Sequence, residues 1–291
     1  RDRSVSRGLG DVYKRQQYVM SEGIILLIAI IYMIVQKIDP IREIPYKRIG
    51  IVDVILSLVA GYCLIPAVLL ISNISMLFST NYLEEGTTTL LTYPFAMQVI
   101  LLAVIPPLVE ELIFRGIFFG SYRKAGMTGA ALMSGLLFGC FHLNINQALY
   151  AFVMGIVFAY MVEATGSLWS SVIAHFAVNT YSIGIVQILK MAGMYAQDGS
   201  VSETFENAES VAGQSTAITV VQIAMIAVIA AVFMMLAVLC IRTMAKRHGN
   251  LEKMKIQSVK LSHIKNYFTA PVIVGIVVCL SLIHISEPTR H

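Results

Sequence analysis

The stretch LLTYPFAMQVILLAVIPPLVEELIFRGIFFG, residues 90–120, indicates the fold class of this chain. It is long and apolar enough for a membrane-spanning helix, which needs about 20 mostly apolar residues. It nevertheless contains Glu110, Glu111 and Arg115. An ionised side chain at the centre of a bilayer costs about 2.5–3.5 kcal/mol on insertion scales, so such residues are rare there and usually functional. This stretch is therefore the first place to look for a function.

Seven further apolar stretches lie on either side of it. The chain has 291 residues, of which 57% are hydrophobic and 13% charged, and its mean hydropathy is +0.76. Soluble domains carry about 25% charged residues. We therefore predict an all-α fold, a polytopic bundle of about eight transmembrane helices. The expected spans are residues 20–35, 49–78, 90–120, 128–143, 147–162, 168–189, 217–241 and 269–279.

The two ends of the chain read as an artefact. With suitable codons, the reverse complement of the segment that encodes SRGLGDVYKRQ, residues 6–16, encodes LSLIHISEPTR, residues 280–290, without a mismatch. Two ends of a natural protein have no reason to be antisense copies, so we exclude them as adapter-like sequence. The expected organisation is an artefact over 1–16, N-terminal transmembrane helices over 17–89, a core over 90–190 that carries the motifs described below, an external loop and C-terminal transmembrane helices over 191–279, and an artefact over 280–291.

The charge balance of the remaining chain excludes a nucleic-acid-binding protein. Removing both ends takes six basic residues from 21 and three acidic residues from 17, which leaves 15 basic against 14 acidic residues. The loops at 37–48, 123–124 and 242–265 are basic, whereas those at 82–85 and 198–209 are acidic. Basic loops lie on the cytoplasmic side of most membrane proteins, so the sequence predicts that these three loops are cytoplasmic.

The spacing of the charged residues predicts how they pair. Glu111 and Arg115 are four residues apart, so they share a helix face and can form an ion pair. Each residue advances about 100° around a helix, which turns Glu110 about 140° away from Arg115. Glu110 is then the carboxylate left free to act on another group. Pro106 and Pro107 remove backbone donors one turn earlier and should bend or break the helix there.

Two more apolar spans carry polar pairs with the same spacing of four residues. These are Phe138 with His142, and His175 with Asn179. A rise of about 1.5 Å per residue places Glu111, His142 and His175 at similar depth, within the middle third of the bilayer. Polar groups from three helices at one depth can meet, so we expect one shared site.

Each of these features also has a purely structural interpretation. A Glu–Arg pair in a membrane can clamp a helix or belong to a transport pathway. His142, or His175 with Asn179, can hydrogen-bond a neighbouring helix. We expect Asp53 and Glu163 to face the membrane interface, and Tyr150 to be an aromatic residue of the membrane boundary. The coincidence of all three polar sets favours a catalytic site.

Together the three sets resemble the CAAX-protease and bacteriocin-processing family of intramembrane peptidases, called CPBP or Abi. Members carry Glu-Glu-x-x-x-Arg, then Phe-x-x-x-His, then His-x-x-x-Asn or His-x-x-x-Asp, on three helices in that order. The matching residues here include no substitution, and the resemblance covers about residues 90–190. They are Glu110, Glu111, Arg115, Phe138, His142, His175 and Asn179.

The resemblance implies an endopeptidase that hydrolyses a peptide bond in a membrane-associated protein or peptide. Glu110 would be the general base for a water molecule also held by His142. His175 and Asn179 would donate hydrogen bonds to the oxyanion of the tetrahedral intermediate, and Glu111 with Arg115 would orient Glu110. Alternatively Glu110, His142 and His175 would hold a catalytic Zn²⁺, as in a metalloprotease. The sequence leaves the zinc-dependent and metal-free versions open.

Two other functional classes remain open at this point. One is a transporter or ion relay that uses the Glu-Arg-His cluster, although no inverted repeat of the kind found in many transporters is present. The other is a non-catalytic bacteriocin-immunity protein. The expected partners are the lipid bilayer and a membrane-associated substrate. The expected location is the cytoplasmic membrane of a bacterium.

Overall fold

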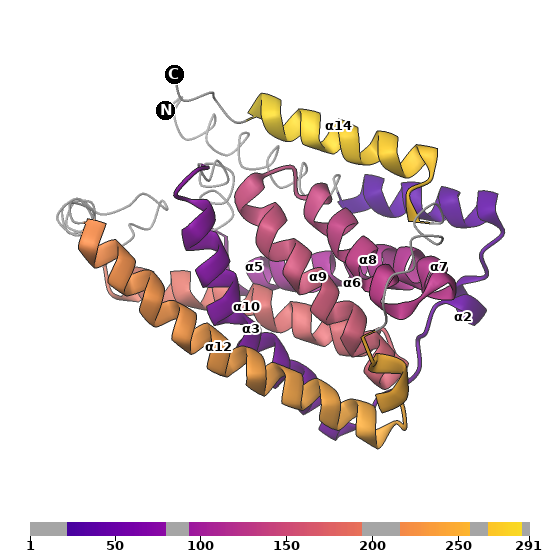
Figure 1. The fold of residues 1–291 in the computed structure, drawn as a ribbon, viewed down its shortest axis with the longest axis horizontal. Coiled ribbons are helices and arrows are strands. Elements are labelled where there is room, and N and C mark those ends of the chain that lie inside the picture. The colour runs from indigo at the N-terminus through magenta and orange to yellow at the C-terminus, as the bar shows by residue number, and fades with distance from the viewer. Residues whose placement is uncertain (1–21, 80–92, 194–215, 257–266, 287–291) are drawn as a thin grey trace.

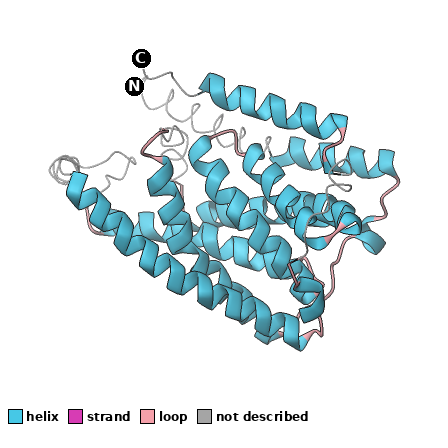
Figure 2. Ribbon diagram, in the orientation of Figure 1, coloured by secondary structure: helices cyan, strands magenta, loops and turns pink. Residues whose placement is uncertain are grey.

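The computed structural model describes residues 22–79, 93–193, 216–256 and 267–286, and every regular element within these ranges is a helix (Figure 2). The all-α class is therefore confirmed. In chain order the elements are a helix over Glu22–Gln36, α2 (Pro40–Glu43), α3 (Ile51–Ser75), α5 (Phe95–Gln98), η1 (Val99–Val104), α6 (Ile105–Glu111), η2 (Leu112–Phe119), α7 (Gly120–Tyr122), η3 (Arg123–Ala125), α8 (Met127–Phe141), α9 (Ile145–Thr165), α10 (Trp169–Met191), α12 (Thr216–Arg247), η4 (Leu251–Met254) and α14 (Ala270–Ser286).

Five helical segments within the described residues are long and apolar enough to cross a membrane. They are Ile51–Ser75, Phe95–Ala125, Ile145–Thr165, Trp169–Met191 and Val220–Arg247. Three shorter apolar helices, Glu22–Gln36, Met127–Phe141 and Val272–His284, fall below this length. Each of the eight expected spans thus contains a helix, but the expected count of eight membrane crossings is not confirmed. The polytopic character is confirmed.

Several expectations concern residues outside the described ranges. The acidic loops at 82–85 and 198–209 and part of the basic loop at 242–265 fall there, as does the adapter-like segment 1–16. At the C-terminal end of the chain, α14 runs from Ala270 to Ser286 as one helix. It therefore crosses the boundary expected at residue 279 between the last transmembrane helix and the adapter-like segment.

The helices that carry the three motifs lie between two outer layers. In Figure 1, α12 runs beside α3 along one side of the molecule, whereas α14 lies on the opposite side, next to the N-terminal helix. The segments α6, α8, α9 and α10 lie between these layers. Of the polar motif residues, Glu110, Glu111, Arg115 and His175 are buried, whereas His142 and Asn179 are partly exposed.

The long segment Phe95–Ala125 is irregular on both sides of its prolines. It is wound as a π-helix over Val99–Val104, as an α-helix over Ile105–Glu111, and again as a π-helix over Leu112–Phe119. Pro106 and Pro107 stand in the first turn of α6, where a helix does not need their missing N–H groups. The sequence predicted a bend or break at these two prolines. The helix continues past them, because the π-helical turns on either side accommodate the prolines.

The crossing of α8 and α9 depends on two glycines spaced four residues apart. A Cβ atom at Gly135 would lie 2.6 Å from the Phe152 carbonyl oxygen, and one at Gly139 would lie 2.6 Å from the Ala148 carbonyl oxygen. Small residues at this spacing let two helix backbones approach closely. The two glycines therefore fix α9 against the end of α8 that carries the Phe138–His142 motif.

Two acidic residues expected at the membrane interface are buried instead. Asp53 contacts Arg247 at 3.2 Å and His248 at 3.0 Å, which joins the start of α3 to the end of α12. Glu163 pairs with Arg123, which joins α9 to the end of the segment Phe95–Ala125. The interface expectation was wrong for both, because cationic partners from other helices offset the cost of burying the carboxylates.

Candidate active site

The Glu111–Arg115 ion pair expected from the sequence is present. Arg115 Nη1 donates to Glu111 Oε1 at 2.8 Å, and both side chains have no exposed surface. The guanidinium also lies 4.3 Å from the Phe138 ring centroid and 5.2 Å from that of Phe158. These ring faces attract a cation, which helps to offset its burial. Arg115 Nε and Nη2 and Glu111 Oε2 have no hydrogen-bond partner among the described residues.

His175 lies between the two adjacent glutamates. Its Nδ1 is 3.0 Å from Glu111 Oε1, and its Nε2 is 3.7 Å from Glu110 Oε2. The carboxylate oxygen of Glu111 that accepts from Arg115 therefore also contacts the imidazole ring. The sequence predicted Glu111 as the partner of Arg115 and, with it, as a support for Glu110, but not as a partner of His175. Its second contact, with a residue 64 positions away, fixes the orientation of His175.

Asn179 is bound to the backbone of the irregular helix. Its Nδ2 donates to the Leu102 carbonyl oxygen at 2.9 Å. In an α-helix that carbonyl would accept from residue 106, and in a π-helix from residue 107. Both positions are proline and have no N–H group. The two prolines thus leave the Leu102 carbonyl free, and Asn179 satisfies it from α10.

His142 occupies a turn and lies outside the regular part of a helix. The α8 helix ends at Phe141, and the next residue after His142, Leu143, has a positive φ of 52°. His142 Nδ1 is 2.8 Å from the Phe138 carbonyl oxygen, and its ring stands edge-on to the Phe138 ring at 4.8 Å. The two residues of this motif therefore contact each other. The expectation that His142 lies within a spanning helix was wrong, because α8 is only 15 residues long.

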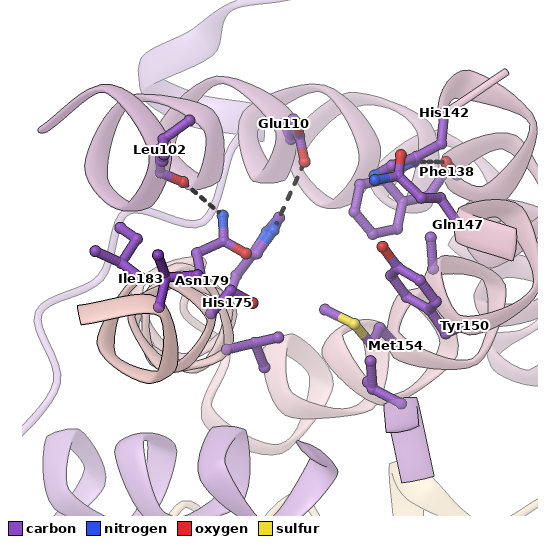
Figure 3. Close-up of a pocket in the computed structure, with 15 residues that line it drawn as sticks. Leu102, Glu110, Phe138, His142, Gln147, Tyr150, Met154, His175, Asn179 and Ile183 are labelled. Atoms are coloured by element: carbon purple, nitrogen blue, oxygen red, sulfur yellow. Dashed lines mark hydrogen bonds and ion pairs between the residues drawn. The ribbon is translucent and has the colours of Figure 1, made fainter. Parts of the chain in front are cut away.

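Four of the six predicted site residues line one cavity of about 320 Å³. They are Glu110, His142, His175 and Asn179, and Phe138 lines it with them. Figure 3 shows Glu110, His175 and Asn179 on one side of this cavity and Tyr150 across from them. Glu111 and Arg115 do not line it and lie behind His175, which they support.

Sequence reasoning missed three polar residues of the cavity wall, Gln147, Tyr150 and Ser182. The expectation that Tyr150 is a boundary aromatic was wrong, because it lies inside the molecule next to the candidate site (Figure 3). A signal was available in the sequence. Gln147, Tyr150 and Met154 are spaced three and four residues apart, so they share one face of α9, and all three line the cavity.

The expected zinc ligands do not form a coordination site in this structure. A carboxylate and two imidazoles suit a catalytic zinc ion chemically. Among the described residues, however, no three His, Cys, Asp or Glu side chains converge closely enough to hold one metal ion. Glu110, His142 and His175 line the same cavity without meeting at one point. The zinc version remains a prediction, and no step below depends on it.

A comparison with known protein families matches the part of the chain that carries the three motifs. Residues 92–181 match the sequence model of the Rce1-like family, described as type II CAAX prenyl endopeptidase Rce1-like. A Bacillus subtilis (strain 168) protein named "Putative membrane peptidase YdiL" is 33% identical over 88 residues, which are 30% of this chain and 36% of that protein. The chain thus matches about a third of the length of this curated relative. No solved structure matches. The resemblance predicted from the three motifs is confirmed over residues 92–181, which match the Rce1-like family model.

Proposed function

We propose that this protein is an intramembrane endopeptidase that hydrolyses a peptide bond in a membrane-associated protein or peptide. The observation that carries the proposal is the position of Glu110. It lines the cavity, it is only 7% exposed, and its Oε2 atom has no hydrogen-bond partner among the described residues. A buried carboxylate with an open acceptor needs a proton or a hydrogen-bond donor, and a water molecule in the cavity supplies one.

A histidine that lines the same cavity favours hydrolysis over a purely structural role. His142 Nδ1 faces a carbonyl oxygen, which can only accept, so the neutral ring carries its proton on Nδ1. Its Nε2 then has a lone pair that can accept from the same water. A water held by two acceptors is oriented and polarised for attack on a carbonyl carbon.

The reaction then follows from these groups. Glu110 takes one proton from the water, and the water oxygen forms a bond to the scissile carbonyl carbon, whose oxygen becomes the oxyanion. When the carbon–nitrogen bond breaks, Glu110 returns the proton to the leaving nitrogen. One water is consumed, and the products are a carboxylic acid and an amine. Glu111 and Arg115 do not touch the substrate in this scheme, because they act by holding His175.

The remaining wall of the cavity supports a membrane-associated substrate. It is mostly apolar, and an extended peptide with aliphatic side chains fits such a surface. The apolar lining residues are Val68, Leu102, Ala151, Met154, Val178, Ile183 and Val186. The similarity to a bacterial membrane peptidase supports the cytoplasmic membrane of a bacterium as the location.

The test is peptide cleavage by the full chain in proteoliposomes. The probes are an internally quenched farnesylated peptide with three residues after the prenylated cysteine, and a library of lipid-anchored peptides read by mass spectrometry. We expect cleavage of at least one probe, and Glu110→Gln should lower kcat by about 10²–10⁴-fold because the base is lost. Glu252→Gln is the matched control, since that residue is 80% exposed and outside the cavity.

Three outcomes would contradict the proposal or part of it. Cleavage of no probe by the folded protein would favour the non-catalytic immunity protein. Proton or ion flux that depends on Glu110, without cleavage, would favour the ion relay. Turnover that is lost on chelation and returns with bound zinc would replace the metal-free scheme by the zinc version, whereas undiminished turnover of metal-free protein would rule zinc out.

A further inference from the structure

The two histidines of the cavity offer no neutral hydrogen-bond donor to a ligand. His142 Nδ1 faces the Phe138 carbonyl oxygen, and His175 Nδ1 faces the Glu111 carboxylate. Both partners can only accept, so each neutral ring carries its proton on Nδ1. The Nε2 atoms of both rings are then acceptors. His175 can donate from Nε2 only as an imidazolium.

Asn179 is also partly engaged. One N–H of its side-chain amide donates to the Leu102 carbonyl, which leaves a single N–H for a ligand. The wall formed by α6 and α10 offers this N–H and the Ser182 hydroxyl as neutral donors. Sites that stabilise an oxyanion commonly present two or more fixed donors where the negative charge develops. A donor on the opposite wall would let the site hold such an oxygen from both sides.

Tyr150 supplies a hydroxyl group from the opposite wall. In Figure 3 its ring extends from α9 into the cavity, across from Glu110 and His175. Tyr150 and Glu110 line the same cavity. Its position is fixed, because the close approach of α8 at Gly135 and Gly139 holds the backbone of α9 in this part of the helix. A phenolic hydroxyl can donate one hydrogen bond and remains protonated at neutral pH in an apolar site.

We propose that Tyr150 is a catalytic hydrogen-bond donor to the carbonyl oxygen of the scissile bond. This inference rests on the proposed peptidase function. The hydroxyl and the remaining N–H of Asn179 would contact that oxygen from opposite sides. Both hydrogen bonds strengthen as the oxygen becomes an oxyanion, and the proton stays on the tyrosine oxygen throughout. No bond to Tyr150 forms or breaks.

The test compares two variants on the same helix. Tyr150→Phe removes only the hydroxyl oxygen, and Tyr160→Phe makes the same change ten residues further along α9, outside the cavity. With the peptide probe cleaved by the wild type, we expect Tyr150→Phe to lower kcat by about 10²–10³-fold, as the loss of one such donor does. KM should change little, and Tyr160→Phe should match the wild type.

A second measurement separates this role from a structural one. A phosphonate analogue of the cleaved probe carries a negatively charged tetrahedral centre in place of the scissile amide. Both ligands are bound to the Glu110→Gln protein, which leaves the peptide uncleaved. Adding Tyr150→Phe to that protein should weaken its binding of the phosphonate much more than its binding of the peptide. Equal kcat for Tyr150→Phe and Tyr160→Phe, or equal losses of affinity for both ligands, would overturn the inference. Loss of turnover in Glu110→Gln alone would leave the peptidase function intact, whereas full turnover there would contradict the proposed site itself.

Discussion

Two clusters in the described part of the molecule are built from the same kinds of side chain, a carboxylate, an arginine and a histidine. The inner cluster is Glu111, Arg115 and His175, with side chains that are 0%, 0% and 5% exposed. The outer cluster is Asp53, Arg247 and His248, with side chains that are 3%, 45% and 31% exposed. In both, the carboxylate contacts the arginine and the histidine within 3.2 Å.

The difference lies in what surrounds each cluster. Both cations of the outer cluster reach the surface, so water solvates them, and the cluster joins the ends of α3 and α12. The inner cluster has no such contact with water, and Glu111 Oε2 and two nitrogen atoms of Arg115 lack partners among the described residues. It also holds a histidine that lines the cavity. The same three kinds of side chain thus join two helix ends in the outer cluster and hold the cavity-lining His175 in the inner cluster.

The largest expected effect is that of Arg115→Met on stability. This change leaves the Glu111 charge buried without its cationic partner, which typically costs about 3–5 kcal/mol. Thermal unfolding in nanodiscs measures it. Arg247→Met is the matched control in the outer cluster and should cost about 1 kcal/mol or less, because that pair is partly exposed to solvent. Equal losses in the two variants would show that burial does not separate the clusters.

An intermediate effect is expected when both charges of the inner pair are removed together. The variant Glu111→Leu with Arg115→Met leaves no unpaired charge from this pair, so its unfolding temperature should lie closer to that of the wild type than to that of Arg115→Met. Its turnover should stay low, because His175 loses the acceptor for Nδ1. Recovery of turnover together with stability would show that Glu111 has no positioning role.

The smallest effect is expected for Asp53→Asn. The freed Arg247 and His248 can be solvated, so the loss of stability should be about 1 kcal/mol or less, and turnover should equal that of the wild type. Salt at 1 M shortens the Debye length to about 3 Å, which should shrink this loss further. The loss caused by Arg115→Met should not respond to salt. A salt-independent loss for Asp53→Asn would place the outer cluster in the same class as the inner one.

Much of the helical framework could be predicted from the sequence. Each expected apolar stretch contains a helix, and the spacing of Glu111 and Arg115 correctly predicted their ion pair, since one helical turn fixes which side chains are neighbours. Hydrophobic length was a poorer guide to membrane crossings, because α8 stops at Phe141 after 15 residues.

Contacts between helices were much harder to predict. Asp53 was assigned to the interface, yet it pairs with a histidine 195 positions away. The contact of His175 with Glu111 and that of Asn179 with the Leu102 carbonyl were also missed. Neither follows from residue type, because a carboxylate or an amide can bind any donor or acceptor that packing brings near it.

The sequence by itself determined where the helical segments lie along the chain, which residues are charged in an apolar setting, and which motifs follow one another. These properties are local, because they depend on hydrophobicity and on the 3.6-residue repeat of a helix. Only the tertiary structure decided that Glu111 supports His175, that two prolines leave a carbonyl for Asn179, and that Tyr150 faces the cavity. Those contacts depend on how the helices cross, and the crossing is set by side-chain volume, as the close approach at Gly135 and Gly139 illustrates.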